Sequence, residues 1–375
     1  MPTCLLFTMS KPASPVRVAL ILFLCSLFWG CRDAGHAVPP DESAAATSVV
    51  APVEEPKTEP EPEPESVEPP VASEPKQLRF LSCNLEAHQI TRGVEGEERS
   101  LKILKAAKEI AALAKIIVDA DPDVLGISST GDRNDLVELQ RKLKESGLDL
   151  PNLRHTGGSD PLRYLGLLSR YPIHDSNPAP KIAYELRDEP MVMMRGILHA
   201  QVDVHGRELH FIGAHLISKY ELSDPSQEQS RSHEAYLVRE HADTILDRDP
   251  SALAIVYGTL NDTRNTAANY IVEGDDGSRS YFEAVDHPDS LDEMWTYKDV
   301  WEDVYYRADF VHVSASLLEM VVADQCRTID DAQWRNASDH RPLLSIIGLE
   351  APTSEVEDVP SPDSNSDSTA TPGTP

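Results

Sequence analysis

The chain has 375 residues, of which 63 are acidic and 34 are basic, so its net charge at neutral pH is −29. Residues 77–350 have the apolar content of one packed domain, and they too have a net negative charge. An acidic surface repels phosphate backbones, which disfavours tight, sequence-independent binding of nucleic acid. A small phosphorylated substrate, or one bridged by a metal ion, is repelled less.

Residues 1–31 have the order of a secretion signal, in which basic residues precede an apolar run and a small residue follows it. The apolar run, residues 18–29, is too short to cross a hydrocarbon core of ~30 Å as a helix, so we expect export without a permanent transmembrane anchor. Cys31 resembles the acylated cysteine of bacterial lipoproteins, which implies attachment to the cell envelope, in the periplasm or at the cell surface. Phe28 and Trp29 are bulkier than the residues usual at those places, so cleavage of the signal without a lipid stays open.

Two further segments have the composition of disordered chain. Residues 32–76 contain a Pro-Glu repeat, which cannot bury apolar surface and keeps the backbone extended. Residues 351–375 are acidic and rich in Ser, Thr and Pro. We therefore expect a spacer that holds the domain away from a membrane, and a disordered tail.

The domain contains two cysteines, Cys83 and Cys326. Both lie among apolar residues, where a buried free thiol is common, although a disulfide between them stays open in an exported protein. There is no C-x-x-C spacing, which argues against a structural zinc site.

Apolar periodicity predicts strands and helices in alternation along the domain. The expected strands are residues 78–84, 123–127, 164–169, 191–204, 207–215, a segment beginning at 254, 309–313, 317–322 and 342–347. The expected helices are residues 101–118, 134–146, 227–246 and 263–272. His205-Gly206 predicts a hairpin turn between two long strands. Since hairpins occur among the alternating elements, we expect an α/β domain with mixed sheets covered by helices.

Several of the expected strands end in polar residues, at sites where a sheet holds side chains rigidly and leaves them accessible. These residues are Asn84, Ser128-Ser129, His215, Asn261-Asp262, Asp309 and Ser338-Asp339-His340. Each also has a structural interpretation. A histidine can be satisfied in a core, an asparagine can form a turn, and an aspartate can cap one.

The segments FLSCNLE, DPDVLGISS, GLLSRYPI, HFIGAHL, VYGTLND, RADFVHVS and ASDHRPLL follow one another in an order and spacing that resemble the endonuclease/exonuclease/phosphatase family. This family includes DNase I-like enzymes, sphingomyelinases and inositol-phosphate phosphatases. The resemblance covers about residues 78–349. It implies a four-layered α/β/β/α sandwich and a Mg²⁺- or Mn²⁺-dependent attack of water on a phosphoester.

The resemblance also implies roles for individual residues. His340 contacts the phosphoryl oxygens, and Asp309 fixes its ring and raises its basicity. Asp339 lies beside the metal or its water, and Asn84 is a ligand of the metal or the phosphate. His215 donates a hydrogen bond to the phosphate from the other side.

Two carboxylates of the family pattern are missing. Ile127-Ser128-Ser129 stands where the family has Leu-Gln-Glu, and Gly258-Thr259-Leu260-Asn261 stands where it has Gly-Asp-x-Asn. The resemblance implies that the family's Glu is the principal metal ligand and that its Asp is the base or the partner of the metal-bound water, while Asn261 keeps the role of orienting the nucleophile. Serine and threonine hydroxyls bind Mg²⁺ less well and do not accept a proton near neutral pH.

Three nearby acids are candidates to replace the lost charge. Glu86 shares a strand face with Asn84 if the strand continues past it. Asp132 follows Ser129 closely, and Asp262 is near Thr259 in the chain. The alternative for each is an acid on the solvated surface.

The sequence thus supports two functional hypotheses. The first is an exported phosphoesterase, anchored to the envelope, with an altered metal site. The second is a catalytically inactive family member that acts as a binding module at the envelope. A third interpretation is purely structural, and in it the polar residues at the strand ends do not form a shared site. The substrate class stays open, since the loops around residues 86–100, 174–190 and 273–306 would select it.

Overall fold

The computed structural model describes residues 76–86, 105–160, 162–174, 178–219, 227–300 and 302–349. The expected signal, Cys31, most of the Pro-Glu spacer and the acidic tail lie outside these ranges and stay predictions. Within these ranges no helix is long and apolar enough to cross a membrane.

Two mixed sheets form the centre of the domain. The order of the six-stranded sheet is β14 (Arg327–Thr328), β15 (Leu343–Gly348), β1 (Gln77–Asn84), β2 (Val124–Thr130), β4 (Tyr164–Ser169) and β3 (Asn152–Thr156). The order of the five-stranded sheet is β10 (Phe282–Ala284), β13 (Asp309–Ser314), β9 (Leu253–Thr259), β8 (Arg207–His215) and β7 (Ile197–Val204). One pair in each sheet is parallel, β1 with β2 and β8 with β9.

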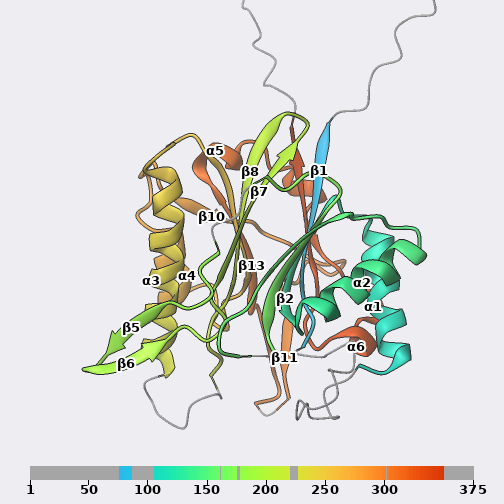
Figure 1. Cartoon of the computed structure of the whole chain (residues 1–375), viewed down its shortest axis with the longest axis horizontal. Helices are drawn as coiled ribbons and strands as arrows, with labels where there is room; N and C mark the ends of the chain where they lie inside the picture. Colours follow the sequence, from blue (N-terminus) through green and yellow to red (C-terminus); the bar gives the residue numbers. More distant parts are fainter. Residues whose placement is uncertain are drawn as a thin grey trace, which may run out of the picture. The chain divides into compact units, whose positions relative to one another are not determined.

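Helices cover the outer face of each sheet (Figure 1). On the six-stranded sheet these are α1 (Ala107–Ala120), α2 (Arg133–Glu145) and α6 (Trp334–Ala337). On the five-stranded sheet they are α3 (Gln227–Leu246) and α4 (Ala267–Glu273). The remaining described elements are the hairpins β5 (Ala183–Leu186) with β6 (Glu189–Val192) and β11 (Tyr297–Asp299) with β12 (Val304–Tyr306), the turn α5 (Ala315–Leu318) and the 3₁₀ turn at Ala323–Gln325. The predicted four-layered α/β/β/α sandwich is confirmed.

The strand sequences are nearly continuous runs of apolar residues, because both faces of each sheet are buried. In β13, Val311 and Val313 lie in the core between the sheets, and Phe310 lies in the core beneath α3 and α4. Burial on both sides leaves the strand ends as the places where polar side chains reach solvent.

Tyr257 of β9 joins the two sheets. Its ring lies edge-on to Phe80 of β1, with ring centroids 5.2 Å apart, and its hydroxyl donates a hydrogen bond to the carbonyl oxygen of Gly166 in β4 at 3.1 Å. A Cβ atom at Gly126 of β2 would lie 2.4 Å from the Tyr257 ring, so a glycine is needed there for the sheets to approach this closely.

Two expected elements are wrong in part. The strand expected at 191–204 is broken into β6 and β7, because Gly196 adopts a φ of +66° and the carbonyl oxygen of Ala179 lies 2.5 Å from where its Cβ atom would be. The strand expected at 317–322 is a helical turn, α5, followed by a single bridge from Val321 to Ile347.

Other differences are small. Helix α4 begins at Ala267, later than expected, since the carbonyl oxygen of Thr263 is bonded by the side chains of Thr266 and Asn269 in a turn before it. Cys83 and Cys326 are both buried and free, which decides against the disulfide.

Candidate active site

The polar strand ends meet because of the strand register. In the five-stranded sheet, Thr259 pairs with His215 on one side and with Asp309 on the other. In the six-stranded sheet, Asn84 pairs with Ser128. The two sheets therefore bring one row of polar residues each to the same end of the sandwich.

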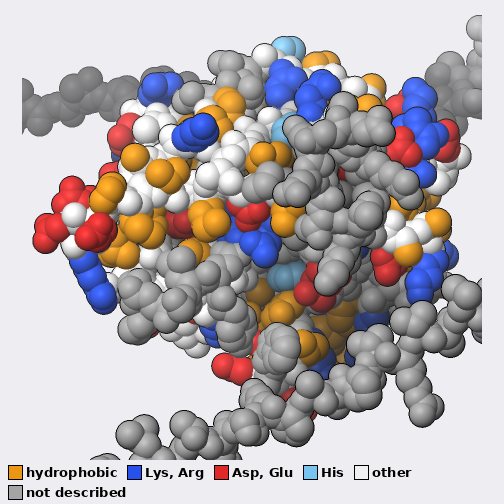
Figure 2. Space-filling model, turned by 60° about the horizontal axis from the view of Figure 1, so that its bottom comes forward, with side chains coloured by type: hydrophobic (Ala, Val, Ile, Leu, Met, Phe, Trp, Pro, Cys, Tyr) orange, Lys and Arg blue, Asp and Glu red, His pale blue; other side chains and the backbone are white. Residues whose placement is uncertain are grey.

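A cavity of about 190 Å³ lies at this end. In Figure 2, which turns this end forward, histidine, acidic and basic side chains surround a hollow in the surface. Most of the residues predicted from the sequence line the cavity: Asn84, Glu86, Ser129, His215, Asn261, Asp339 and His340.

His340 and Asp309 form a buried pair, with His340 Nδ1 2.7 Å from Asp309 Oδ2. Asp309 also accepts hydrogen bonds from the hydroxyls of Thr296 at 2.7 Å and Thr259 at 2.6 Å. Burial alone would lower the pKa of His340, but the charge and hydrogen bond of Asp309, with help from Asp339, raise that pKa to about 9. The ring is therefore a cation at neutral pH, and Asp309 fixes its orientation.

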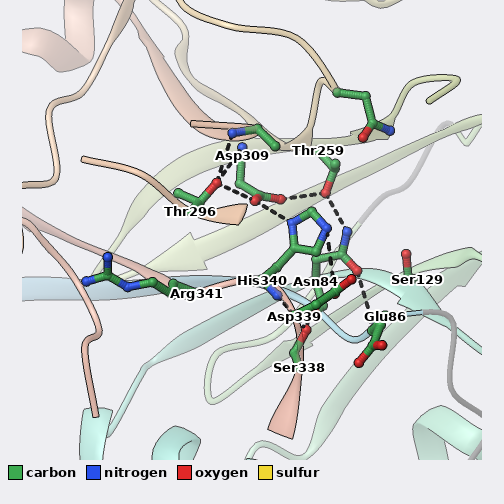
Figure 3. A network of polar contacts seen from close by, with 12 residues as sticks. Asn84, Glu86, Ser129, Thr259, Thr296, Asp309, Ser338, Asp339, His340 and Arg341 are labelled. Atoms are coloured by element: carbon green, nitrogen blue, oxygen red, sulfur yellow. Dashed lines mark hydrogen bonds and ion pairs between the residues drawn. The ribbon is translucent and has the colours of Figure 1, made fainter. Parts of the chain in front are cut away.

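Thr259, one of the two positions where the resemblance implies a replaced acid, is fully buried and does not line the cavity. Its hydroxyl accepts a hydrogen bond from Asn84 Nδ2 at 2.9 Å and donates to Asp309 Oδ1 (Figure 3). A neutral hydroxyl can do both, whereas a carboxylate at this place would face the Asp309 carboxylate. Thr259 therefore links the two sheets.

The end of β1 is tied to the loop that carries His340. Asn84 accepts a hydrogen bond from the backbone of Glu86 at 2.8 Å through its side-chain oxygen, and its carbonyl oxygen accepts one from the Ser338 hydroxyl at 2.7 Å. The backbone of His340 in turn donates to that hydroxyl at 3.1 Å. Ser338 thereby holds the position of His340 relative to Asn84.

Glu86 reaches the cavity by a different route from the one expected. The strand ends at Asn84, and Glu86 has a left-handed backbone with a φ of +57°. Its carboxylate accepts a hydrogen bond from the backbone of Asp339. Burial, followed by the nearby charge of Asp339, raises the pKa of Glu86 to about 7, against a lowering effect of Lys105.

Glu86 and Asp339 are suited to a hard cation, because two neighbouring carboxylates each raise the cost of the other's charge and a cation removes it. Oδ1 of Asp339 is buried, accepts no hydrogen bond from the described part of the chain, and lies 3.8 Å from Nε2 of His340. Among the described residues, however, no three His, Cys, Asp or Glu side chains gather as a metal site. The donors fit a cation held by two carboxylates.

Ser129, the second position where the resemblance implies a replaced acid, lines the cavity and contacts His215. Its Oγ lies 3.0 Å from His215 Nδ1. The pKa of His215 is held well below its usual range, first by burial and then by the charges of Arg195 and Arg163, so this ring is neutral at neutral pH.

Asn261, which has a φ of +54°, donates from Nδ2 to the carbonyl oxygen of Leu216 at 2.7 Å and still lines the cavity. Its neighbour Asp262 is buried in an ion pair with Arg231 at 3.1 Å. Asp132 accepts hydrogen bonds from two backbone amides at the start of α2 and caps that helix. The expectation that Asp262 or Asp132 replaces a lost acid is therefore wrong, since both carboxylates are engaged elsewhere.

Five residues of the cavity wall were not predicted: Arg163, Ser218, Lys219, Tyr297 and Tyr306. The Tyr297 ring lies 4.6 Å from the His340 ring between centroids, and Nζ of Lys219 lies 4.7 Å from the centre of the Tyr306 ring. All five stand in loops or in the short hairpin β11–β12, where no periodic pattern marks them.

The domain is similar to known proteins in part of its sequence and in its fold. A family model described as "Endonuclease/Exonuclease/phosphatase family" matches residues 97–280. Among curated proteins, no sequence matches the chain.

Solved structures share the fold. An endonuclease/exonuclease/phosphatase from Bacteroides vulgatus is 18% identical, with a TM-score of 0.53, and the match covers 73% of this chain and 99% of that one. A family protein from Bacteroides thetaiotaomicron is 15% identical, with a TM-score of 0.50 and coverages of 74% and 99%. TDP2 from Caenorhabditis elegans is 17% identical, with a TM-score of 0.50 and coverages of 72% and 74%.

At sequence identities of 15–18%, the solved structures show only that the fold is shared. The family model is the match at the level of sequence. The family model and the shared fold, together with the strand-end residues described above, support assignment of the chain to the endonuclease/exonuclease/phosphatase family, whose fold is that of phosphoester hydrolases.

Proposed function

We propose that the chain is an exported, envelope-anchored phosphoester hydrolase that depends on a divalent cation and has an altered metal site. The observation that carries this proposal is the shared cavity in which the His340 ring, oriented by Asp309, faces two adjacent carboxylates, Glu86 and Asp339.

The cavity is suited to an anion although the protein as a whole is acidic. His340, Arg163 and Lys219 bring positive charge to its wall, and the side-chain amides of Asn84 and Asn261 lie beside them. Positioned donors of this kind stabilise the negative charge that grows on phosphoryl oxygens in the transition state. Nε2 of His340 is the nitrogen left available for that purpose, because Nδ1 is held by Asp309.

Glu86 and Asp339 would hold Mg²⁺ or Mn²⁺. When bound, the cation would neutralise charge on the phosphoryl oxygens as a Lewis acid. No carboxylate at position 259 is present to take a proton from water, and general-base catalysis is worth roughly 10²–10⁴-fold in rate. We therefore expect slow turnover compared with a family member that keeps both acids.

Turnover and cation binding can be tested separately. Release of p-nitrophenol from bis(p-nitrophenyl) phosphate and p-nitrophenyl phosphate should require Mg²⁺ or Mn²⁺, and calorimetric titration should show one cation site. Glu86→Gln and Asp339→Asn should weaken cation binding, whereas His340→Gln should abolish turnover and leave cation binding in place. Asp149→Asn, at an exposed acid outside the cavity, is the matched control. Absence of both cation binding and turnover would reject the proposal.

A second candidate function is phosphate binding without hydrolysis. It is favoured by the two replaced acids, since the Thr259 hydroxyl is engaged by Asn84 and Asp309 and the Ser129 hydroxyl by His215. Inorganic phosphate or a phosphoester that binds in the cavity and is never turned over, with or without a cation, would support this function over the first.

Export and anchoring rest on residues 1–31 and Cys31. Metabolic labelling with an alkyne fatty acid should label the wild-type protein in bacterial membranes, and Cys31→Ser should remove the label. A secreted, unlabelled wild-type protein would show cleavage without a lipid. The acidic charge also predicts weak binding to random-sequence DNA, which fluorescence anisotropy at physiological salt can check.

A further inference from the structure

The serine at the position of the family's metal-binding acid is placed as a nucleophile would be. Ser129 Oγ lies 3.0 Å from Nδ1 of His215, within the 2.6–3.2 Å range over which a base can take a proton from a nucleophile. Both side chains line the same cavity, and both are buried apart from that opening.

Ser129 lies in an irregular part of strand β2, and its backbone conformation places its side chain in the cavity wall. Strand β2 changes register against β4 between Ile127 and Thr130, and Ser129 has a φ of +59° inside this bulge. Bulges redirect side chains and are frequent beside active sites. A left-handed backbone is unfavourable at a residue other than glycine, so the surrounding structure must hold Ser129 in it.

The surroundings keep His215 unprotonated, which a base must be before it can accept a proton from Ser129. His215 is the neutral partner of the two cavity histidines, since burial and the charges of Arg195 and Arg163 disfavour its protonation. Arg163 also lines the cavity and is held in place by Asp160 at 2.9 Å. A phosphoester drawn to this positive charge would meet the hydroxyl of Ser129.

We propose that Ser129 is the nucleophile of a two-step phosphoester hydrolysis and that His215 is its base. This inference rests on the proposed hydrolase function and adds a covalent phosphoseryl intermediate to it. In the first step it also accounts for the missing acid at position 259, because the attacking group there is the serine hydroxyl and not a water molecule.

In the first step, the bond from Ser129 Oγ to phosphorus forms while the bond from phosphorus to the leaving oxygen breaks. The serine proton passes to His215 Nδ1, and the leaving oxygen takes a proton from solvent. In the second step, water attacks phosphorus and gives up one proton to solvent. The bond from phosphorus to Oγ breaks, and Oγ takes back its proton from His215.

The first test uses diisopropyl fluorophosphate, a reagent that labels activated serines without turnover. Peptide mass spectrometry should find one adduct, at Ser129. Ser129→Gly should abolish it, and this variant suits the backbone because glycine adopts a φ of +59° without strain. His215→Gln should slow labelling by about 10²-fold or more.

The matched control is Ser128→Ala. Ser128 is the adjacent serine of the same bulge, is buried outside the cavity lining, and has no hydrogen-bond partner for its hydroxyl in the described structure. This variant should label like the wild type. No adduct, an adduct at another residue, or labelling that is unchanged in His215→Gln would overturn the inference.

The second test separates the inference from the proposed function. With p-nitrophenyl phosphate as substrate, wild-type turnover that falls more than about 10²-fold in Ser129→Gly, with phosphoserine 129 found after acid quenching, supports both. Turnover that persists in Ser129→Gly keeps the hydrolase and overturns the nucleophile. An adduct at Ser129 without any phosphoester turnover supports the activated serine and rejects the proposed hydrolase.

Discussion

The Thr259 hydroxyl donates a hydrogen bond of 2.6 Å to Oδ1 of Asp309. The same hydroxyl accepts from Asn84, so one neutral group connects the residue that orients His340 with the end of β1 in the other sheet. This network needs a neutral group at position 259, and an aspartate there would disrupt it.

Thr259→Asp should destabilise the protein by roughly 1–3 kcal/mol at pH 8, because two buried carboxylates would then face each other. The loss should be smaller at pH 5.5, where the pair can share a proton. Urea unfolding at the two pH values measures it. Thr259→Ser, which keeps the hydroxyl, is the control and should stay close to the wild type. A Thr259→Asp variant as stable as the wild type would show that the network has room for a second acid.

The charge of His340 should stabilise the fold up to alkaline pH. The folded pKa of about 9 lies above the usual 6.5, so this stabilisation is complete below pH 6.5 and is lost as pH rises through 9. In His340→Gln, the deficit in free energy of unfolding should therefore be largest below pH 6.5 and shrink towards pH 9. NMR titration of the ring should give a midpoint near 9, and a midpoint near 6.5 would contradict the role of Asp309.

His312 should limit stability in acid. It is fully buried on β13, and neither ring nitrogen has a hydrogen-bond partner in the described part of the chain. Burial, then the charges of Arg307 and Arg264, lowers its pKa to about 3, so the stability that depends on the neutral ring is present above pH 6.5 and is lost as pH falls towards 3.

His312→Leu should therefore lose less stability than the wild type between pH 7 and pH 5, by on the order of 2 kcal/mol. Urea unfolding at several pH values measures the difference. His174→Gln, at an exposed histidine, should follow the wild type. Parallel pH profiles for His312→Leu and the wild type would show that His312 is not responsible for acid sensitivity.

Cys83 and Cys326 should be unreactive in the folded protein. Both are buried, and burial raises the pKa of each thiol, which keeps the reactive thiolate scarce. Peptide mass spectrometry after iodoacetamide treatment should find neither residue labelled under native conditions and both labelled in urea. A peptide pair joined through these cysteines would contradict the free thiols.

The elements that the sequence predicted best have a complete local signal. Strands β4 and β8 have the expected bounds, because their apolar residues lie between distinct turn residues such as His205-Gly206. Helix α3 has the expected bounds too, although its first two turns are polar. The segment 317–322 lacked such a signal. Leu317 is buried and Leu318 is exposed. This apolar run is therefore a single helical turn that places one side chain in the core, and not a strand.

The residues of the candidate site also differ in how clearly the sequence marks them. Motif residues such as His340 and Asn84 could be found from the sequence because their types and order are distinctive. Thr296, which supports Asp309, and Arg163 could not, since loops bring them to the cavity from segments without a pattern. The engagement of Asp132 as a helix cap also depends on where α2 begins, to within one residue.

Ser129 and His215 belong to different sheets, so no local feature of either strand determines the 3.0 Å between them. The thickness of the layer between the sheets determines it, and Tyr257, packed against Gly126 three residues before Ser129, sets that thickness near the site. A single methyl group at Gly126 would push the sheets apart and separate nucleophile from base. An apolar contact that touches no ligand thus sets the distance over which the proposed proton transfer takes place.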